Sequence, residues 1–307
     1  MRRCYRLVVS LFVVLTATFA MIHLIPGDPV RAALGQTASP GLVASRKHLL
    51  GLDQPLLHQY LHYISSLLTG NLGTSIVTNQ PVGPLIAARL PNTIELAGLA
   101  FAVVVVIAYP LGLLLAIRTY DDRRQRTELA FTTFTGVIGT VPEFVLAAGL
   151  VAAFGVAIHL FPVAGQAGPV SYVLPVTALS LGPALLLARV VRVEAVRVLN
   201  EDYIRTARGK RLTARVLYLR HALPNMVTGS LTIAGNLLPA LIAGTVLVEN
   251  VFAWPGLGTA IADSVIQQDY AVVQAIVLVL ATTVLAVNFA IDIALAVLDP
   301  LSTVRDS

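Results

Sequence analysis

The sequence predicts an all-α integral membrane protein with six transmembrane helices and both termini on the cytoplasmic side. The 307 residues are 56% hydrophobic and 12% charged, with a mean hydropathy of +0.80. That charged fraction is about half the fraction of an ordinary soluble domain. Six apolar stretches are long enough to enter a bilayer, and with six crossings 17 of the 21 basic residues lie on one side. This asymmetry assigns that side to the cytoplasm.

Residues 1–25 are interpreted as a cytoplasmic tip followed by a first transmembrane helix. Three arginines lie within the first six residues, and residues 7–25 contain no Lys, Arg, Asp or Glu. A cleavable signal peptide has a similar layout. However, this apolar run is longer than usual, and Thr18-Phe19-Ala20 is a poor cleavage site. Pro26-Gly27-Asp28-Pro29 is expected to end the helix.

Residues 26–92 are the longest polar region, and the orientation of the first span assigns them to the outside. Within them, residues 56–68 predict an amphipathic helix. His58 and His62 are four residues apart on this helix, a spacing that suits a metal ion. With no third ligand nearby, the two side chains are also explained as part of the solvated face.

A second span is predicted at residues 96–117, with a kink at Pro110-Leu111-Gly112. Residues 129–161 form a third apolar region that is too long for one untilted helix, and Pro142 is expected to start or kink it. Glu143 follows the proline. A carboxylate at membrane depth is a candidate for a functional site. The alternative is a first-turn Glu that the helix dipole stabilises near an interface.

The last three spans are predicted at residues 171–188, 227–248 and 271–298. Gly229, Gly235 and Gly244 in the fifth span predict close packing against neighbouring helices. Asn288 and Asp292 lie four residues apart in the sixth, where they suit structural hydrogen bonding between helices or contact with a substrate.

A basic loop, residues 192–225, connects the fourth and fifth spans. Asp202 is placed to N-cap a short helix that carries Tyr203, Ile204 and Ala207 on one face. Arg205 and Arg208 lie off that face, and Gly209 readily ends a helix. Because so short a helix is unstable alone, it requires a surface to pack against. We therefore predict a docking element for a cytoplasmic partner.

Two strings in the sequence resemble a known family. Asp202-Tyr203-Ile204-Arg205-Thr206-Ala207-Arg208, followed by His221-Ala222-Leu223-Pro224-Asn225, resembles the cytoplasmic loop of bacterial ABC-transporter permeases of the dipeptide, oligopeptide and nickel group. Glu249-Asn250-Val251-Phe252-Ala253-Trp254-Pro255-Gly256-Leu257-Gly258 and Asp269-Tyr270 match the same family. Residues 51–55 and 70–75 also resemble family segments, and Asp299-Pro300 ends the last span as in the family, with Leu301 in place of the usual arginine. One departure is that the family's glycine, four residues after the loop alanine, falls on Arg211.

The resemblance implies the type I ABC importer permease fold, with residues 93–307 as the permease domain. It also implies a cytoplasmic-membrane complex of this chain with a second related permease, two ATP-binding cassette ATPase subunits and an extracytoplasmic substrate-binding protein. The loop would couple to an ATPase through Asp202, Tyr203, Ile204, Arg205, Thr206, Ala207, Arg208, Gly209, Arg211 and Leu212. Candidates for the pathway or its gate are Glu143, Glu249, Phe252, Trp254, Pro255 and Asp292.

The chain lacks an ATP-binding motif of the form G-x-x-x-x-G-K-[ST] and the protease or esterase motifs H-E-x-x-H and G-x-S-x-G. We therefore expect no enzyme activity and no metal site in this chain, with ATP and Mg bound by partner subunits. The basic residues are concentrated in loops rather than along a stripe, which excludes nucleic acid as a partner. The expected substrate is a dipeptide or oligopeptide. The alternatives are nickel or another small solute, and an ion-coupled secondary transporter that uses Glu143 and Asp292.

Overall fold

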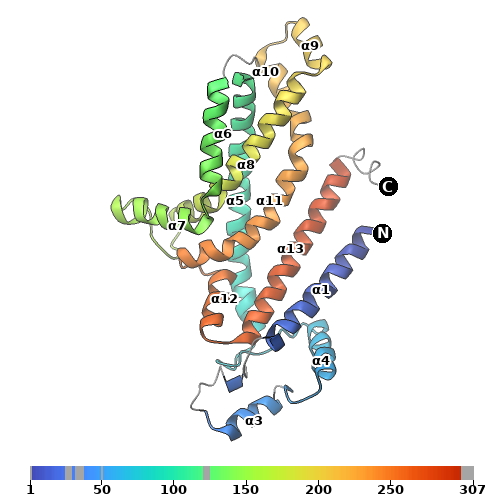
Figure 1. Ribbon diagram of the computed structural model, residues 1–307, viewed down its shortest axis with the longest axis vertical. Coiled ribbons are helices and arrows are strands. Elements are labelled where there is room, and N and C mark those ends of the chain that lie inside the picture. The colour runs from blue at the N-terminus through green and yellow to red at the C-terminus, as the bar shows by residue number, and fades with distance from the viewer. Residues whose placement is uncertain (1, 25–29, 32–37, 50, 120–124, 299–307) are drawn as a thin grey trace. The chain divides into compact units, whose positions relative to one another are not determined.

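The computed structural model describes residues 2–24, 30–31, 38–49, 51–119 and 125–298 (Figure 1). These residues form helices and connecting turns, with one isolated β-bridge between Thr74 and Pro81. The chain divides into two compact units. The first comprises Met1–Ile94 and Pro255–Ala286, and the second Glu95–Trp254 and Val287–Ser307. The predicted break at residues 26–29, the basic residues at 123, 124 and 305, and the family-like end at 299–301 lie outside the described residues.

The described helices account for the six predicted spans. Five continuous segments are long and apolar enough to cross a membrane. The sixth is the pair α6 (Gln125–Thr140) and α7 (Glu143–Leu150), which continues into the π-helix η1 (Val151–Ala157) and is bent by 92° at its break. The five are α1 (Arg2–Leu24), α5 (Val82–Thr119), η2 with α8 (Pro169–Tyr172, Val173–Leu199), α10 with η3 and α11 (Ala214–Val216, Leu217–Ala222, Leu223–Val251), and α13 (Tyr270–Leu298).

Pro142 was expected to start or kink a helix, and it immediately precedes the first residue of α7. Pro142 has extended backbone angles, φ −58° and ψ 143°, and α7 starts at the next residue. Because proline cannot donate a backbone hydrogen bond, it is tolerated at a helix start and disfavoured inside one. The third apolar region therefore folds as two helices with different directions rather than as one long span.

The second and fourth spans are longer than predicted. α5 starts at Val82, fourteen residues before the expected start at 96. α8 runs through Pro183 and continues to Leu199, eleven residues beyond the expected end at 188. Arg189, Arg192 and Arg197 are therefore helical rather than part of a loop. α11 likewise starts at Leu223, so both ends of the predicted 192–225 loop are in the helices that flank it.

The glycines of α11 allow close contact inside the second unit, as predicted. A Cβ atom added at Gly229, Gly235 or Gly244 would lie 2.6–2.7 Å from a side-chain atom of a neighbouring helix. These atoms belong to Glu194, Ile291 and Glu143, respectively. Small residues of this kind let helices pack closely in lipid, where hydrophobicity gives no drive for association.

Gly112 makes a closer backbone contact, between α5 and α8. A Cβ atom there would lie 2.7 Å from the carbonyl oxygen of Ala188 and 2.8 Å from Cβ of Val191. We expect Gly112→Ala to lower the free energy of unfolding by about 1–3 kcal/mol, because backbone atoms must move. Gly98→Ala, on the same helix with nothing within 4 Å, should change it by less than about 1 kcal/mol. Thermal unfolding of the purified permease tests this, and equal effects would contradict it.

The first unit contains α3 (Pro40–Leu49), α4 (Leu56–Leu68) and α12 (Leu257–Ile266). The bounds of α4 are those predicted, whereas α3 and α12 were not predicted. α4 packs on α1 through hydroxyl contacts: Tyr60 Oη lies 2.8 Å from Thr16 Oγ1, and Tyr63 Oη 3.2 Å from Thr18 Oγ1. At ten residues α12 is too short to cross a bilayer.

Five of the described helices end in the same backbone motif, in which one residue has a positive φ. The amide of this residue donates a hydrogen bond to the carbonyl three residues earlier. The amide of the following residue donates to the carbonyl five residues before that following residue. Glycine occupies the position after α3 and α4 (Gly51 and Gly70), but Arg211, Ala253 and Gln268 occupy it after α9, α11 and α12. Non-glycine residues are disfavoured in this conformation.

Candidate functional site

A short helix, α9 (Asp202–Gly209), follows α8 directly in the second unit (Figure 1). Only Asn200 and Glu201 separate the two helices. Glu201, not Asp202, is the N-cap residue, and its carbonyl accepts hydrogen bonds from Ile204 N and Arg205 N at 3.0 and 3.2 Å. The predicted cap at Asp202 is therefore wrong by one residue. Asp202 instead accepts a hydrogen bond from Arg205 Nη1 at 3.3 Å.

One face of α9 is buried and the other is basic. Ile204 and Ala207 are buried, as predicted. Tyr203 is 42% exposed, which corrects its assignment to the buried face. Partial burial and the neighbouring Glu201 charge raise the pKa of the Tyr203 phenol. The Arg205 side chain is 68% exposed, and Arg208 is also exposed. The helix therefore presents positive charge outward from an apolar base.

Arg211 is the residue that terminates this helix motif. Its φ is +53°, its amide bonds the Arg208 carbonyl at 2.9 Å, and the Leu212 amide lies 3.5 Å from the Ala207 carbonyl. Gly209 is the last helical residue, and a side chain there would meet no atom within 4 Å. The family's glycine position, occupied here by Arg211, is thus the position with the left-handed backbone.

We expect Arg211→Gly to stabilise the end of α9 by about 1 kcal/mol, because glycine adopts a positive φ without steric cost. Hydrogen exchange of the Arg208–Leu212 amides should slow by about fivefold. Lys210→Gly is the control, since Lys210 has a φ of −76°, where glycine relieves no strain. Faster exchange in Arg211→Gly would show that the arginine side chain, rather than the backbone, determines stability there.

The chain returns to the fifth span through α10 and η3. Leu217 and Ala222 of η3 are buried, and η3 contacts α9, α8 and α11. Pro224 lies in the first turn of α11, where its missing N–H removes no helical hydrogen bond. Asn225 Nδ2 donates to the His221 carbonyl at 2.9 Å. The second half of the family string thus packs as a helical connection from α9 to α11.

Arg192 joins three helices of the second unit close to α9. Its Nη2 lies 2.8 Å from Glu128 Oε1 on α6, and its Nε donates to Thr119 Oγ1 on α5 at 3.1 Å. The side chain is 13% exposed, whereas Glu128 is 41% exposed. The sequence did not predict this cluster, because its members are far apart along the chain and none belongs to a motif. Arg192 therefore connects α8 to α5 and α6.

Glu143 is the first residue of α7 and is half-buried. Its carboxylate packs over Gly244 of α11, where an added Cβ atom would lie 2.6 Å from Oε2 and 3.3 Å from Cδ1 of Leu179. Its position in a first turn matches the helix-dipole interpretation. The contact with α11 also places the carboxylate beside a second span, so the position does not exclude a role in the pathway.

Three residues of the string from Glu249 to Trp254 are buried in the second unit. Glu249, Phe252 and Trp254 have relative exposures of 0–1%. Trp254 packs edge-on against Tyr172, with ring centroids 4.6 Å apart, and the Phe252 carbonyl accepts a hydrogen bond from Gly165 N at 2.8 Å. In this conformation these three pathway candidates are enclosed by protein.

The rest of that string belongs to the first unit. Asn92 Nδ2 donates to the Pro255 carbonyl at 2.8 Å, and Leu257 N donates to Thr93 Oγ1 at 2.9 Å. A second anchor is Asp269, which accepts hydrogen bonds from Ser75 Oγ and, at 3.1 Å, from Ile76 N. Two family-like segments, residues 70–75 and 269–270, are therefore joined, although they lie almost 200 residues apart.

Asp292 is exposed on α13. Among the described residues, no group of three or more His, Cys, Asp or Glu is placed to hold a metal ion.

Two family models match the chain. The model described as "Binding-protein-dependent transport system inner membrane component" matches residues 108–303. The model described as "Binding-prot-dependent transport system membrane comp, N-term" matches residues 1–97.

Similar proteins agree with these matches. The glutathione transport system permease protein GsiC of Escherichia coli O6:H1 (strain CFT073) is 34% identical over 301 residues, which cover 97% of this chain and 96% of the relative. The protein of that name from Pectobacterium atrosepticum is 35% identical over the same shares. The structure of the MetNI methionine ABC transporter in inward-facing conformations aligns with a TM-score of 0.60 and 19% identity, over 70% of this chain and 96% of that chain. That structural similarity supports the fold alone.

The family matches, the full-length relatives and the helices long enough to cross a membrane lead to one conclusion. This chain is a multi-pass inner-membrane protein of the type I ABC importer permease fold, and it belongs to the family of binding-protein-dependent transport system inner membrane components.

Proposed function

We propose that the chain is a pore-forming permease subunit of an ATP-driven importer, which moves dipeptides or oligopeptides delivered by a substrate-binding protein. The observation that carries this proposal is α9. Its buried residues Ile204 and Ala207 attach it to the spans, and its exposed face is basic. The peptide class is supported by the relatives named for glutathione transport, since glutathione is a tripeptide.

The proposed partners supply what this chain lacks. ATP and Mg bind to two ATPase subunits, and the substrate-binding protein selects the peptide. A second related permease completes the pathway. With both termini cytoplasmic, α9 lies on the same side as the ATPases.

Transport would follow from rigid-body movement. ATP binding closes the ATPase subunits and shifts α9, which is separated from α8 by two residues and contacts η3 at the start of the fifth span. Arg192 passes the displacement of α8 to α5 and α6. Packed helices move as units rather than deforming continuously, so the pathway opens to the outside and then to the inside.

The residues proposed to line or gate the pathway are Glu143, Glu249, Phe252, Trp254, Pro255 and Asp292. Glu143 is half-buried beside Gly244 and can be reached by a modest movement of α7. Glu249, Phe252 and Trp254 are buried, so they would contact substrate only in another conformation. We propose that they form the closed gate of this state.

The proposal is tested with the complete transporter in sealed liposomes. Adding the binding protein loaded with trialanine should stimulate ATP hydrolysis and peptide uptake together. A proton uncoupler should leave uptake unchanged while ATP is held constant. Uptake that stops with the uncoupler would support an ion-coupled secondary transporter instead, and stimulation by nickel but by no peptide would contradict the peptide class.

A further inference from the structure

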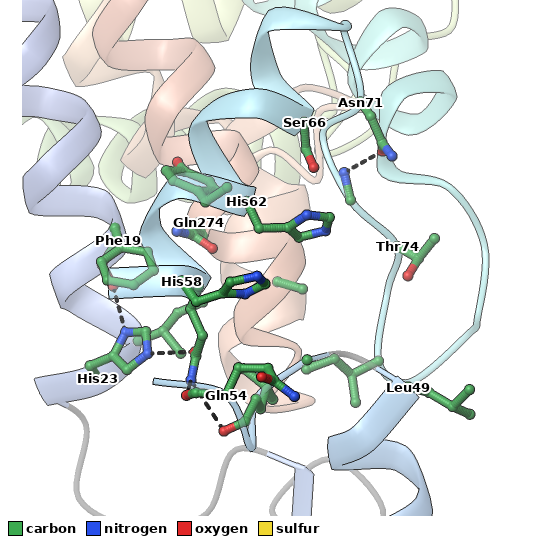
Figure 2. Close-up of a pocket in the computed structure, with 18 of the residues that line it drawn as sticks. Phe19, His23, Leu49, Gln54, His58, His62, Ser66, Asn71, Thr74 and Gln274 are labelled. Atoms are coloured by element: carbon green, nitrogen blue, oxygen red, sulfur yellow. Dashed lines mark hydrogen bonds between the residues drawn. The ribbon is translucent and has the colours of Figure 1, made fainter. Parts of the chain in front are cut away.

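The first unit contains a pocket of about 570 Å³, shown in Figure 2. Its lining comes from the ends of α1 and α3, one face of α4, the loop at residues 71–76 and the start of α13. Its volume lies within the range of small-ligand sites, which is roughly 300–1,000 Å³. Three segments that resemble the permease family, at residues 51–55, 70–75 and 269–270, build or anchor this pocket.

Several hydrogen-bond donors face the pocket. His58 and His62 lie one turn apart on α4, and Figure 2 shows both rings projecting toward the loop that carries Asn71 and Thr74. Within the described part of the chain, neither ring makes a hydrogen bond. Asn71 Oδ1 already accepts from Gly73 N at 2.9 Å, which leaves its NH₂ group as a donor. The pocket therefore suits a ligand rich in acceptors.

The remaining titratable groups of the pocket are already engaged. The Nδ1 atom of His23 lies 3.0 Å from Phe19 O, and its Nε2 atom lies 3.1 Å from Gln59 Oε1. His48 bonds Asp53 at 2.7 Å, which raises the pKa of His48 and lowers that of Asp53. Tyr63 Oη contacts Thr18.

Among the residues that the structure describes, none that lines the pocket is Lys, Arg, Asp or Glu. Of the carboxylates nearby, Asp53 bonds His48, and Asp269 bonds Ser75 and Ile76.

We propose that this pocket binds the C-terminal carboxylate of a short peptide, with His58 and His62 as its hydrogen-bond donors. Leu49, Leu52, Leu72 and Ile76 line the same cavity and would receive an apolar side chain of the peptide. A cavity of this volume holds a small ligand. The inference rests on the proposed peptide importer and adds a peptide-binding site in the first unit.

The test measures direct binding of trialanine and of its C-terminal amide to the purified transporter without its binding protein. Trialanine should bind at least about tenfold more tightly than the amide, because a charge-assisted hydrogen bond is lost in the amide. The double variant His58→Asn, His62→Asn should lower the affinity for trialanine to that of the amide.

The matched control is His159→Asn, which lies outside the pocket at a positive φ that asparagine tolerates. It should bind trialanine as the unchanged protein does. Equal binding of acid and amide would overturn the proposal. So would a double variant that binds trialanine normally but loses affinity for the binding protein, because the pocket would then recognise a protein. If trialanine does not bind while the loaded binding protein still drives uptake, this inference fails and the proposed function stands.

Discussion

Replacing Arg205 and Arg208 with glutamate should reduce both peptide uptake and stimulated ATP hydrolysis by at least about 30-fold. Both side chains are exposed on α9, whereas Ile204 and Ala207 are buried beneath them. If glutamates replace these arginines, α9 places negative charge against the acidic ATPase surface that the arginines would contact. This repulsion weakens the binding free energy by about 2 kcal/mol or more. Because the buried face is unchanged, the permease should still fold and enter the membrane.

The control for this experiment is Arg118→Glu, a charge reversal at the end of α5 that is also exposed. It should retain nearly full uptake. Binding of the ATPase subunits to the α9 variant, measured by co-purification, should fall together with uptake. An α9 variant that retained substrate-stimulated ATP hydrolysis would contradict the coupling role of this helix.

Replacing Arg192 with glutamine should uncouple ATP hydrolysis from transport. The Arg192 side chain is only 13% exposed and joins α8 to Glu128 on α6 and Thr119 on α5, so its loss frees α8 to move without its neighbours. We expect the number of peptides moved per ATP to fall about tenfold. We also expect the free energy of unfolding to fall by about 1–3 kcal/mol, since the half-exposed Glu128 is rehydrated.

Arg197→Gln is the matched control, because Arg197 is on the same helix, is 75% exposed and lies 3.8 Å from Glu194. An exposed pair of this kind contributes little, about 0–1 kcal/mol. The exchanged pair Arg192→Glu, Glu128→Arg should recover part of the transport per ATP. If Arg192→Gln lowered stability but left that ratio unchanged, the residue would serve structure alone.

The sequence predicted the spans well because apolar length is a local property. Residues 56–68 and the last span were placed within a residue of their bounds, and Pro142 was correctly identified as a helix start. The end of α8 was missed because arginines were taken to mark a loop. A membrane helix can continue beyond the bilayer, as α8 does to Leu199. Arg192 is shielded by its neighbours, so that its side chain is only 13% exposed.

The site was predicted less completely, for physical reasons. α9 was found from its pattern, but its cap shifted from Asp202 to Glu201, and Tyr203 proved exposed. α12 was missed because a largely apolar stretch of ten residues after a Pro-Gly turn does not by its pattern distinguish a helix from a loop. The Asp269–Ser75 contact is a tertiary pairing that no local pattern encodes. The family resemblance marked both segments without revealing that they meet.

The most direct test asks whether α9 lies in the cytoplasm beneath an ATPase. Cys4 is the sole cysteine of the chain, so a Cys4→Ser, Thr206→Cys variant carries one thiol at an exposed position of this helix and keeps both arginines. A membrane-impermeant maleimide should modify that thiol in inverted membrane vesicles stripped of the ATPase, but not in intact cells. Adding the ATPase back should block the modification. Modification in intact cells, or no protection by the ATPase, would contradict the account.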